Sequence, residues 1–228
     1  MTLMGLFAKE PPDLERKKMK DYLKILIEKD AWVFNIMYIV SFGGYIGLTT
    51  FLPTFFHDAY GIPKGSMGQF AAVIVIMASI FRVFGGWAAD HWGGIRVLNV
   101  LYFIIILSLF GAALMPNVYM ITAILVVVFS ALGVANGSTF QLVPFRFPYA
   151  TPVAMSLVGE IGALGGGLLP NAMGFSKQYL GSFSGGFIAF GIFTIFVMIV
   201  FKIAQGKWQG KWIGVGGKAL HHEEKIYN

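Results

Sequence analysis

The sequence contains no cysteine and few charged residues, and both shortages narrow the classes of protein to which it can belong. Without cysteine the chain has no disulfides and no thiolate metal sites. Charged residues make up 12% of the 228 residues, about half their usual share in a soluble domain. The 4 histidines lack metal-ligand spacing, and no nucleophile lies beside a general base. The sequence therefore predicts neither an enzyme nor a cofactor or metal centre.

Long hydrophobic runs dominate what is present. Hydrophobic residues account for 57% of the chain, in stretches of the length that a transmembrane helix needs, about 20 residues. We expect an all-α integral membrane protein with six such helices. Their expected ranges, within a bundle spanning 31–204, are 31–56, 66–89, 97–115, 118–145, 152–177 and 183–204.

Basic segments flank this bundle on both sides. Residues 1–30 contain no apolar core of a cleavable signal peptide, so we expect them to stay on the mature protein. Residues 205–228 are glycine-rich and basic, and we expect this tail to be disordered. Both segments are predicted to lie on the cytoplasmic side.

The distribution of lysine and arginine sets this orientation. With a cytoplasmic N-terminus, fourteen of these residues lie inside, and only Lys64 and Lys177 lie outside. Such a positive-inside bias predicts that both termini face the cytoplasm of the inner membrane. It also argues against nucleic acid as a partner, because the charges match the anionic inner leaflet of the lipid bilayer.

The turn between the second and third spans contains a recognisable motif over residues 85–96, GGWAADHWGGIR. Asp90 and Arg96 would lie at the ends of successive helices, where an ion pair could stabilise the turn. The pattern resembles the G-x-x-x-D-x-x-G-G-R loop of the major facilitator superfamily. The corresponding residues are Gly86, Asp90, Gly93, Gly94 and Arg96, with Ile95 as one extra residue before the arginine. In that superfamily the loop follows the second helix of each six-helix half, so the resemblance implies that this chain is one half of a transporter.

Arg82 lies inside the second span, about four residues past its midpoint and on the order of 6 Å toward the cytoplasm. A charge at this depth costs about 2.5–3.5 kcal/mol on insertion scales, and such residues usually face a cavity. The guanidinium fork suits a small planar oxyanion, to which it can donate two parallel hydrogen bonds. The alternative is an internal ion pair with a carboxylate.

The fourth and fifth spans are rich in glycine, over residues 133–144 and 159–167. Glycines at helical spacing flatten one helix face and let two backbones touch, which explains most of them. They do not explain a group of polar residues at buried depth, Asn136, Ser138, Thr139 and Gln141.

Arg82 with the loop motif, the stretch ANGSTFQ over 135–141 and the glycine-rich fifth span ending in LPN at 169–171 together resemble the nitrate/nitrite porter family. The similarity covers about 31–204 and matches the C-terminal half of such a transporter. It implies transport of nitrate or nitrite by alternating access, without a cofactor. It also implies that the chain pairs with an N-terminal six-helix half or with itself.

The resemblance also assigns residues to the anion site. Arg82 would be one of two substrate-binding arginines, and Tyr38 and Phe42 the family's aromatic pair. The polar stretch would add a further set, Asn136, Gly137 and Ser138. The alternative for the aromatic residues is plain packing, since Tyr38, Phe42 and Tyr45 share one helix face.

Glu160 in the fifth span lies at nearly the depth of Arg82. It would either pair with Arg82 when substrate is absent or carry a coupling proton; the alternative is a carboxylic acid hydrogen-bonded at a helix interface. The third and sixth spans have almost no polar residues and are expected to face lipid. Two other functions stay open, namely transport of another small anion or of an organic compound, and a non-transporting membrane subunit.

Overall fold

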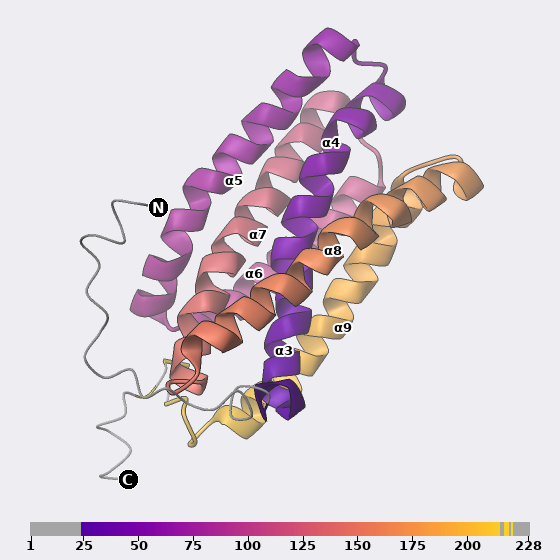
Figure 1. The fold of residues 1–228 in the computed structure, drawn as a ribbon. Helices are drawn as coiled ribbons and strands as arrows, with labels where there is room; N and C mark the ends of the chain where they lie inside the picture. Colours follow the sequence, from indigo (N-terminus) through magenta and orange to yellow (C-terminus); the bar gives the residue numbers. More distant parts are fainter. Residues whose placement is uncertain (1–23, 215–216, 219, 221–228) are drawn as a thin grey trace, which may run out of the picture.

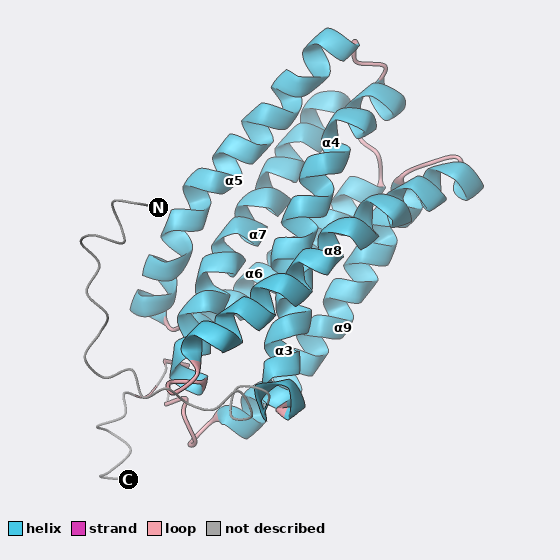
Figure 2. Ribbon diagram, viewed as in Figure 1, coloured by secondary structure: helices cyan, strands magenta, loops and turns pink. Residues whose placement is uncertain are grey.

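The computed structural model describes residues 24–214, 217–218 and 220, and in this part of the chain nearly every residue belongs to a helix (Figures 1 and 2). A short 3₁₀ turn, Lys24–Ile27, leads into three continuous pieces: α3 (Lys29–Tyr38), the π-helical segment η2 (Ile39–Gly43) and α4 (Gly44–Tyr60). The remaining helices are α5 (Lys64–Trp92), α6 (Gly94–Ala113), α7 (Val118–Arg146), α8 (Thr151–Leu180) and α9 (Ser184–Trp208).

The six predicted spans are confirmed as helices that are long and apolar enough to cross a membrane, within the described residues. Each helix is longer than the hydrophobic run that predicted it, although α6 ends two residues before its predicted end and α9 begins one residue later than predicted. The first span, for example, runs from Lys29 to Tyr60. Hydropathy marks the part of a helix that lies in lipid, whereas polar residues beyond it continue the same backbone hydrogen bonding.

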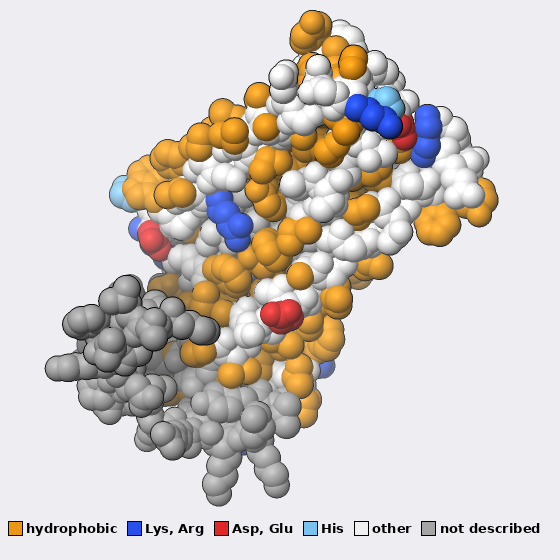
Figure 3. All heavy atoms as spheres, turned by 45° about the horizontal axis from the view of Figure 1, so that its top comes forward, with side chains coloured by type: hydrophobic (Ala, Val, Ile, Leu, Met, Phe, Trp, Pro, Cys, Tyr) orange, Lys and Arg blue, Asp and Glu red, His pale blue; other side chains and the backbone are white. Residues whose placement is uncertain are grey.

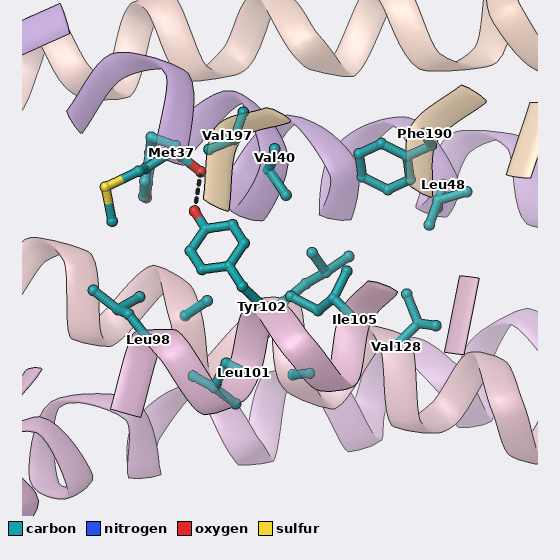
Figure 4. Packing of buried hydrophobic residues seen from close by; sticks show 14 of the residues in the cluster. Met37, Val40, Leu48, Leu98, Leu101, Tyr102, Ile105, Val128, Phe190 and Val197 are labelled. Atoms are coloured by element: carbon teal, nitrogen blue, oxygen red, sulfur yellow. Dashed lines mark hydrogen bonds between the residues drawn. The ribbon is translucent and has the colours of Figure 1, made fainter. Parts of the chain in front are cut away.

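The core of the bundle forms where α6 packs beside α3, α7 and α9. Leu98, Leu101 and Ile105 line one face of α6 together with Tyr102, which is completely buried. Figure 4 shows the Tyr102 hydroxyl donating to the backbone carbonyl of Met37, at 3.0 Å. This bond joins α6 to the last turn of α3, immediately before the backbone changes to π-helical geometry.

The start of α3 and the end of α9 lie at the same end of the bundle, the lower end in Figure 1. There the indole of Trp208 stacks on Phe34 with ring centroids 5.3 Å apart, and its N–H donates to Asp30 at 2.8 Å. Trp212 and Ile213 are also buried. The expectation of a disordered tail is therefore wrong for residues 205–214, because aromatic residues bind that segment to the bundle. Residues 215–216, 219 and 221–228 lie outside the described part.

On the face drawn in Figure 3, hydrophobic side chains are spread widely among uncharged polar groups and backbone, and charged side chains are few. Burial differs strongly between helices. In the most apolar window of each span, 61% of the residues are buried in the first span, 39% in both α6 and α9, 33% in α8 and only 17% in α5. Thus α5 and α8 are more exposed than α6 and α9, the two helices that the sequence predicted to face lipid. The outer faces of α5 and α8 are the ones that no other helix covers.

Candidate functional site

The aromatic pair predicted from the sequence lies at the change from α-helix to π-helix in the first span. Tyr38 ends α3 and Phe42 lies within η2. Their rings stack at 5.0 Å with an interplanar angle of 22°. Phe140 of α7 packs against Tyr38 from another side, with centroids 4.7 Å apart. Single-turn π segments occur frequently at functional sites. This one places the rings of Tyr38 and Phe42 beside α5 and α7.

Close contact with α8 holds this segment in place. A side chain at Gly162 would overlap the Tyr38 ring, and one at Gly165 would meet the Ile39 carbonyl oxygen at 2.8 Å. On the opposing helix, a Cβ at Gly43 would lie 2.7 Å from the Gly165 Cα. The glycines of the fifth span therefore act as the sequence suggested, since they let two backbones meet.

Arg82 of α5 reaches the aromatic pair. Its guanidinium carbon lies 5.6 Å from the centroid of the Phe42 ring, within the range of a cation–π interaction. The same group interacts electrostatically with the Tyr38 hydroxyl. Arg82 is half-buried and forms no ion pair with a carboxylate within the described chain. The structure thus brings Arg82, Tyr38 and Phe42 together, and among the described residues no carboxylate serves as a counter-ion to the guanidinium.

The polar stretch of α7 divides into two kinds of residue. Gly137 and Ser138 join α7 to α5: a Cβ at Gly137 would lie 2.9 Å from the Gly86 nitrogen, and the Ser138 hydroxyl donates to the carbonyl of Gly85 at 3.1 Å. Asn136 is different, because it is 1% exposed and neither atom of its amide has a hydrogen-bond partner. A buried amide left unpaired costs free energy, and such groups deserve an explanation.

Two polar side chains of the first span share this property and were missed by the sequence argument. Asn35 and Ser41 are fully buried, and their side-chain polar atoms have no partner. Asn35 precedes Tyr38 by one helical turn, so the two share a face. The sequence signal that could have identified them is their position in an otherwise apolar run, within one helical turn of Tyr38.

Glu160 does not pair with Arg82 in this structure. Its side chain is exposed on α8, and the described ion pairs of carboxylates join Glu28 and Asp30 to Arg146 instead. The proposed ion pair with Arg82 is therefore wrong for this conformation.

The loop motif forms its turn through backbone geometry rather than through charge. Asp90 and Arg96 are both exposed and form no ion pair with each other, contrary to expectation. Gly93 has φ of 89°, a left-handed conformation that favours glycine, and it joins α5 directly to α6. A Cβ at Gly94 would lie 2.9 Å from Leu142 and Gln141 of α7, so a larger residue would push the turn away. A Cβ at Gly86 would meet nothing within 4 Å.

Comparison with known proteins agrees with this architecture. The family model described as Major Facilitator Superfamily matches residues 1–170. Among curated proteins, the chain is 27% identical over 181 residues to the probable nitrate/nitrite antiporter NarK1 of Thermus thermophilus, covering 71% of this chain and 41% of that protein. It is 26% identical over 200 residues to the nitrite extrusion protein of Bacillus subtilis (strain 168), covering 85% and 51% respectively.

A third relative is the nitrate/nitrite transporter NarU of Escherichia coli (strain K12), 26% identical over 226 residues, with 84% of this chain and 47% of that protein covered. The resemblance to nitrate/nitrite porters is confirmed by these relatives. The chain spans about half the length of the curated relatives it matches.

Proposed function

This chain belongs to the Major Facilitator Superfamily, and on that premise we propose that it is the C-terminal six-helix half of a secondary transporter for nitrate, nitrite or both. The transporter would alternate between inward-open and outward-open states around a site near the middle of the bilayer. Both chain ends would face the cytoplasm, in keeping with the excess of lysine and arginine on that side.

The unpaired guanidinium of Arg82 is the observation on which this proposal rests. Nitrate and nitrite are small planar anions, and a guanidinium can donate two parallel hydrogen bonds to two of their oxygens. The ring of Phe42 lies on one side of the guanidinium, within the range of a cation–π interaction. Because no carboxylate competes for Arg82 in the described chain, an anion would gain the full benefit of the charge.

Neighbouring polar groups would complete the recognition of the anion. The Tyr38 hydroxyl, already close to Arg82, can donate a further hydrogen bond. Asn136 supplies an amide whose hydrogen-bonding atoms are unused. A second arginine would come from the partner half.

The partner would cover α5 and α8. These are the least buried spans, and their outer faces include glycines around which a Cβ would meet nothing within 4 Å, namely Gly65, Gly68, Gly86, Gly159, Gly167 and Gly174. Small residues in membrane helices allow close approach of another helix. The occupant would be an N-terminal six-helix half or a second copy of this chain.

Replacement of Arg82 by lysine tests the anion site. Arg82→Lys keeps the charge but loses the planar fork, so we expect nitrate uptake to fall by about 100-fold, corresponding to about 2.7 kcal/mol. Uptake of labelled nitrate would be measured in a host without other nitrate carriers, with expression checked by blotting. Arg146→Lys is the matched control and should keep most of the uptake. Near-normal transport by a well-expressed Arg82→Lys protein would refute the site.

We also propose that Glu160 carries the coupling proton, because it is an exposed carboxylate on a helix that would face the partner half. Glu160→Gln removes the proton-binding group at nearly constant size, so uptake should lose its dependence on external pH. Glu160→Asp should restore that dependence. The measurement is nitrate uptake across a pH series, and an unchanged profile in Glu160→Gln would exclude the role.

A further inference from the structure

A charged cavity lies at the end of the bundle where α3 begins and α9 ends, and Arg82 does not line it. Its volume is about 620 Å³, and its walls come from the start of α3, the end of α7 and the end of α9. The basic residues around it are Lys29, Arg146, Lys207 and Lys211, and the acidic residue is Asp30.

The two acidic residues at this end of the bundle both form ion pairs with one arginine. Arg146 forms ion pairs with both Glu28 and Asp30. The other oxygen of Asp30 accepts the indole N–H of Trp208 at 2.8 Å. Lys29, Lys207 and Lys211 have no acidic partner within the described chain. The cavity therefore has an excess of positive charge that comes entirely from these three lysines.

An apolar surface leads away from this cavity along α9. Large hydrophobic side chains recur on one exposed face of the helix, at Ile188, Ile192, Phe196, Ile199 and Ile203. Ile203, which is 59% exposed, is also a wall of the cavity, together with Val33 and Val200. A molecule that fits both surfaces has an anionic head and a long apolar tail.

We propose that this cavity binds the phosphate headgroup of an anionic phospholipid, with one acyl chain lying along the exposed face of α9. The cavity is at a helix end, where the headgroups of one leaflet lie. Lysine side chains extend from the apolar part of a membrane helix to the interface and present compact charges to phosphate. Basic pockets between membrane helices are known to bind such headgroups. Free phosphate would satisfy the lysines but not the hydrophobic face.

Native mass spectrometry of the full chain in a neutral detergent tests the proposal. The probes are phosphatidylglycerol, phosphatidylcholine and inorganic phosphate, each titrated against wild type and a Lys29→Gln/Lys207→Gln/Lys211→Gln variant. Each lysine near an anionic surface contributes about fivefold in affinity, so the triple variant should bind phosphatidylglycerol about 100-fold more weakly. Lys202→Gln is the matched control, because Lys202 is an exposed lysine of the same helix outside the cavity.

The proposal is supported if phosphatidylglycerol binds in preference to phosphatidylcholine, and if this preference is lost in the triple variant but kept in Lys202→Gln. Equal binding of the two lipids would overturn it, as would an equal loss in Lys202→Gln, which would indicate diffuse attraction. Binding of inorganic phosphate as tight as that of the lipid would identify a small-anion site instead. If the triple variant does not fold, Lys207→Gln alone should show the fivefold loss, and an unchanged affinity would refute the site.

Discussion

Two arginines of this chain, Arg82 and Arg146, are both half-buried but have opposite surroundings. Arg82 lies within α5 against the ring of Phe42, with no carboxylate partner in the part of the chain that the structure describes. Arg146 ends α7, where Glu28 and Asp30 both pair with it and its guanidinium carbon lies 4.9 Å from the Phe147 ring centroid. Both guanidinium groups contact an aromatic face, so the difference lies in the acidic partners alone.

That difference separates a structural arginine from a candidate binding arginine. The two ion pairs of Arg146 join the start of the first span to the end of the fourth, across 116 and 118 residues of sequence. Their charges are satisfied internally, and little attraction is left for a ligand. Placing the charge of Arg82 inside the membrane costs free energy, and no carboxylate among the described residues offsets that cost. This is expected of a residue whose counter-ion is a ligand.

A carboxylate placed beside Arg82 should remove the difference between the two arginines. We expect its effect to be larger than that of removing Arg146. In Phe42→Glu the new side chain would pair with Arg82 as Asp30 pairs with Arg146. At an effective dielectric constant of about 20, charges about 4 Å apart attract by about 4 kcal/mol, so nitrate uptake should fall by 100-fold or more.

Phe42→Gln is the matched control for that experiment, since it removes the ring without adding charge. It should lose only the cation–π contribution, on the order of 0.5–2 kcal/mol. Uptake assays on both variants at equal expression provide the readout. If the two variants lose uptake equally, the free charge of Arg82 is not what binds the anion.

Removal of Arg146 should have the opposite kind of effect to a change at Arg82. It should lower the stability of the fold without a direct effect on the anion site. Arg146→Gln leaves two partly buried carboxylates unpaired, and we expect a loss of about 1–3 kcal/mol. The readout is thermal unfolding of the purified chain in detergent. Arg146→Lys should show a smaller loss, because one ion pair can persist. A melting temperature unchanged in Arg146→Gln would show that these ion pairs contribute nothing to the fold.

Sequence reasoning performed well where a property depends on neighbours along the chain. Each of the six spans is a continuous apolar run, and Arg82 is conspicuous within one of them because a charge in such a run is costly. Ion pairs were predicted poorly. Asp90 and Arg96 are six positions apart and do not pair, whereas Arg146 pairs with residues more than 100 positions away. Sequence distance does not measure the distance between two side chains in space.

The sequence by itself determined the class of protein, the number of spans and the residue whose charge is out of place, because hydrophobicity acts locally and adds up along a helix. Only the tertiary structure decided which charges are satisfied. Packing of η2, α5, α7 and α8 through their glycines brings Tyr38 and Phe42 to Arg82, and the end of α7 brings Arg146 to the two carboxylates. An electrostatic partner is set by contact, and contact between distant segments exists only once the helices have packed.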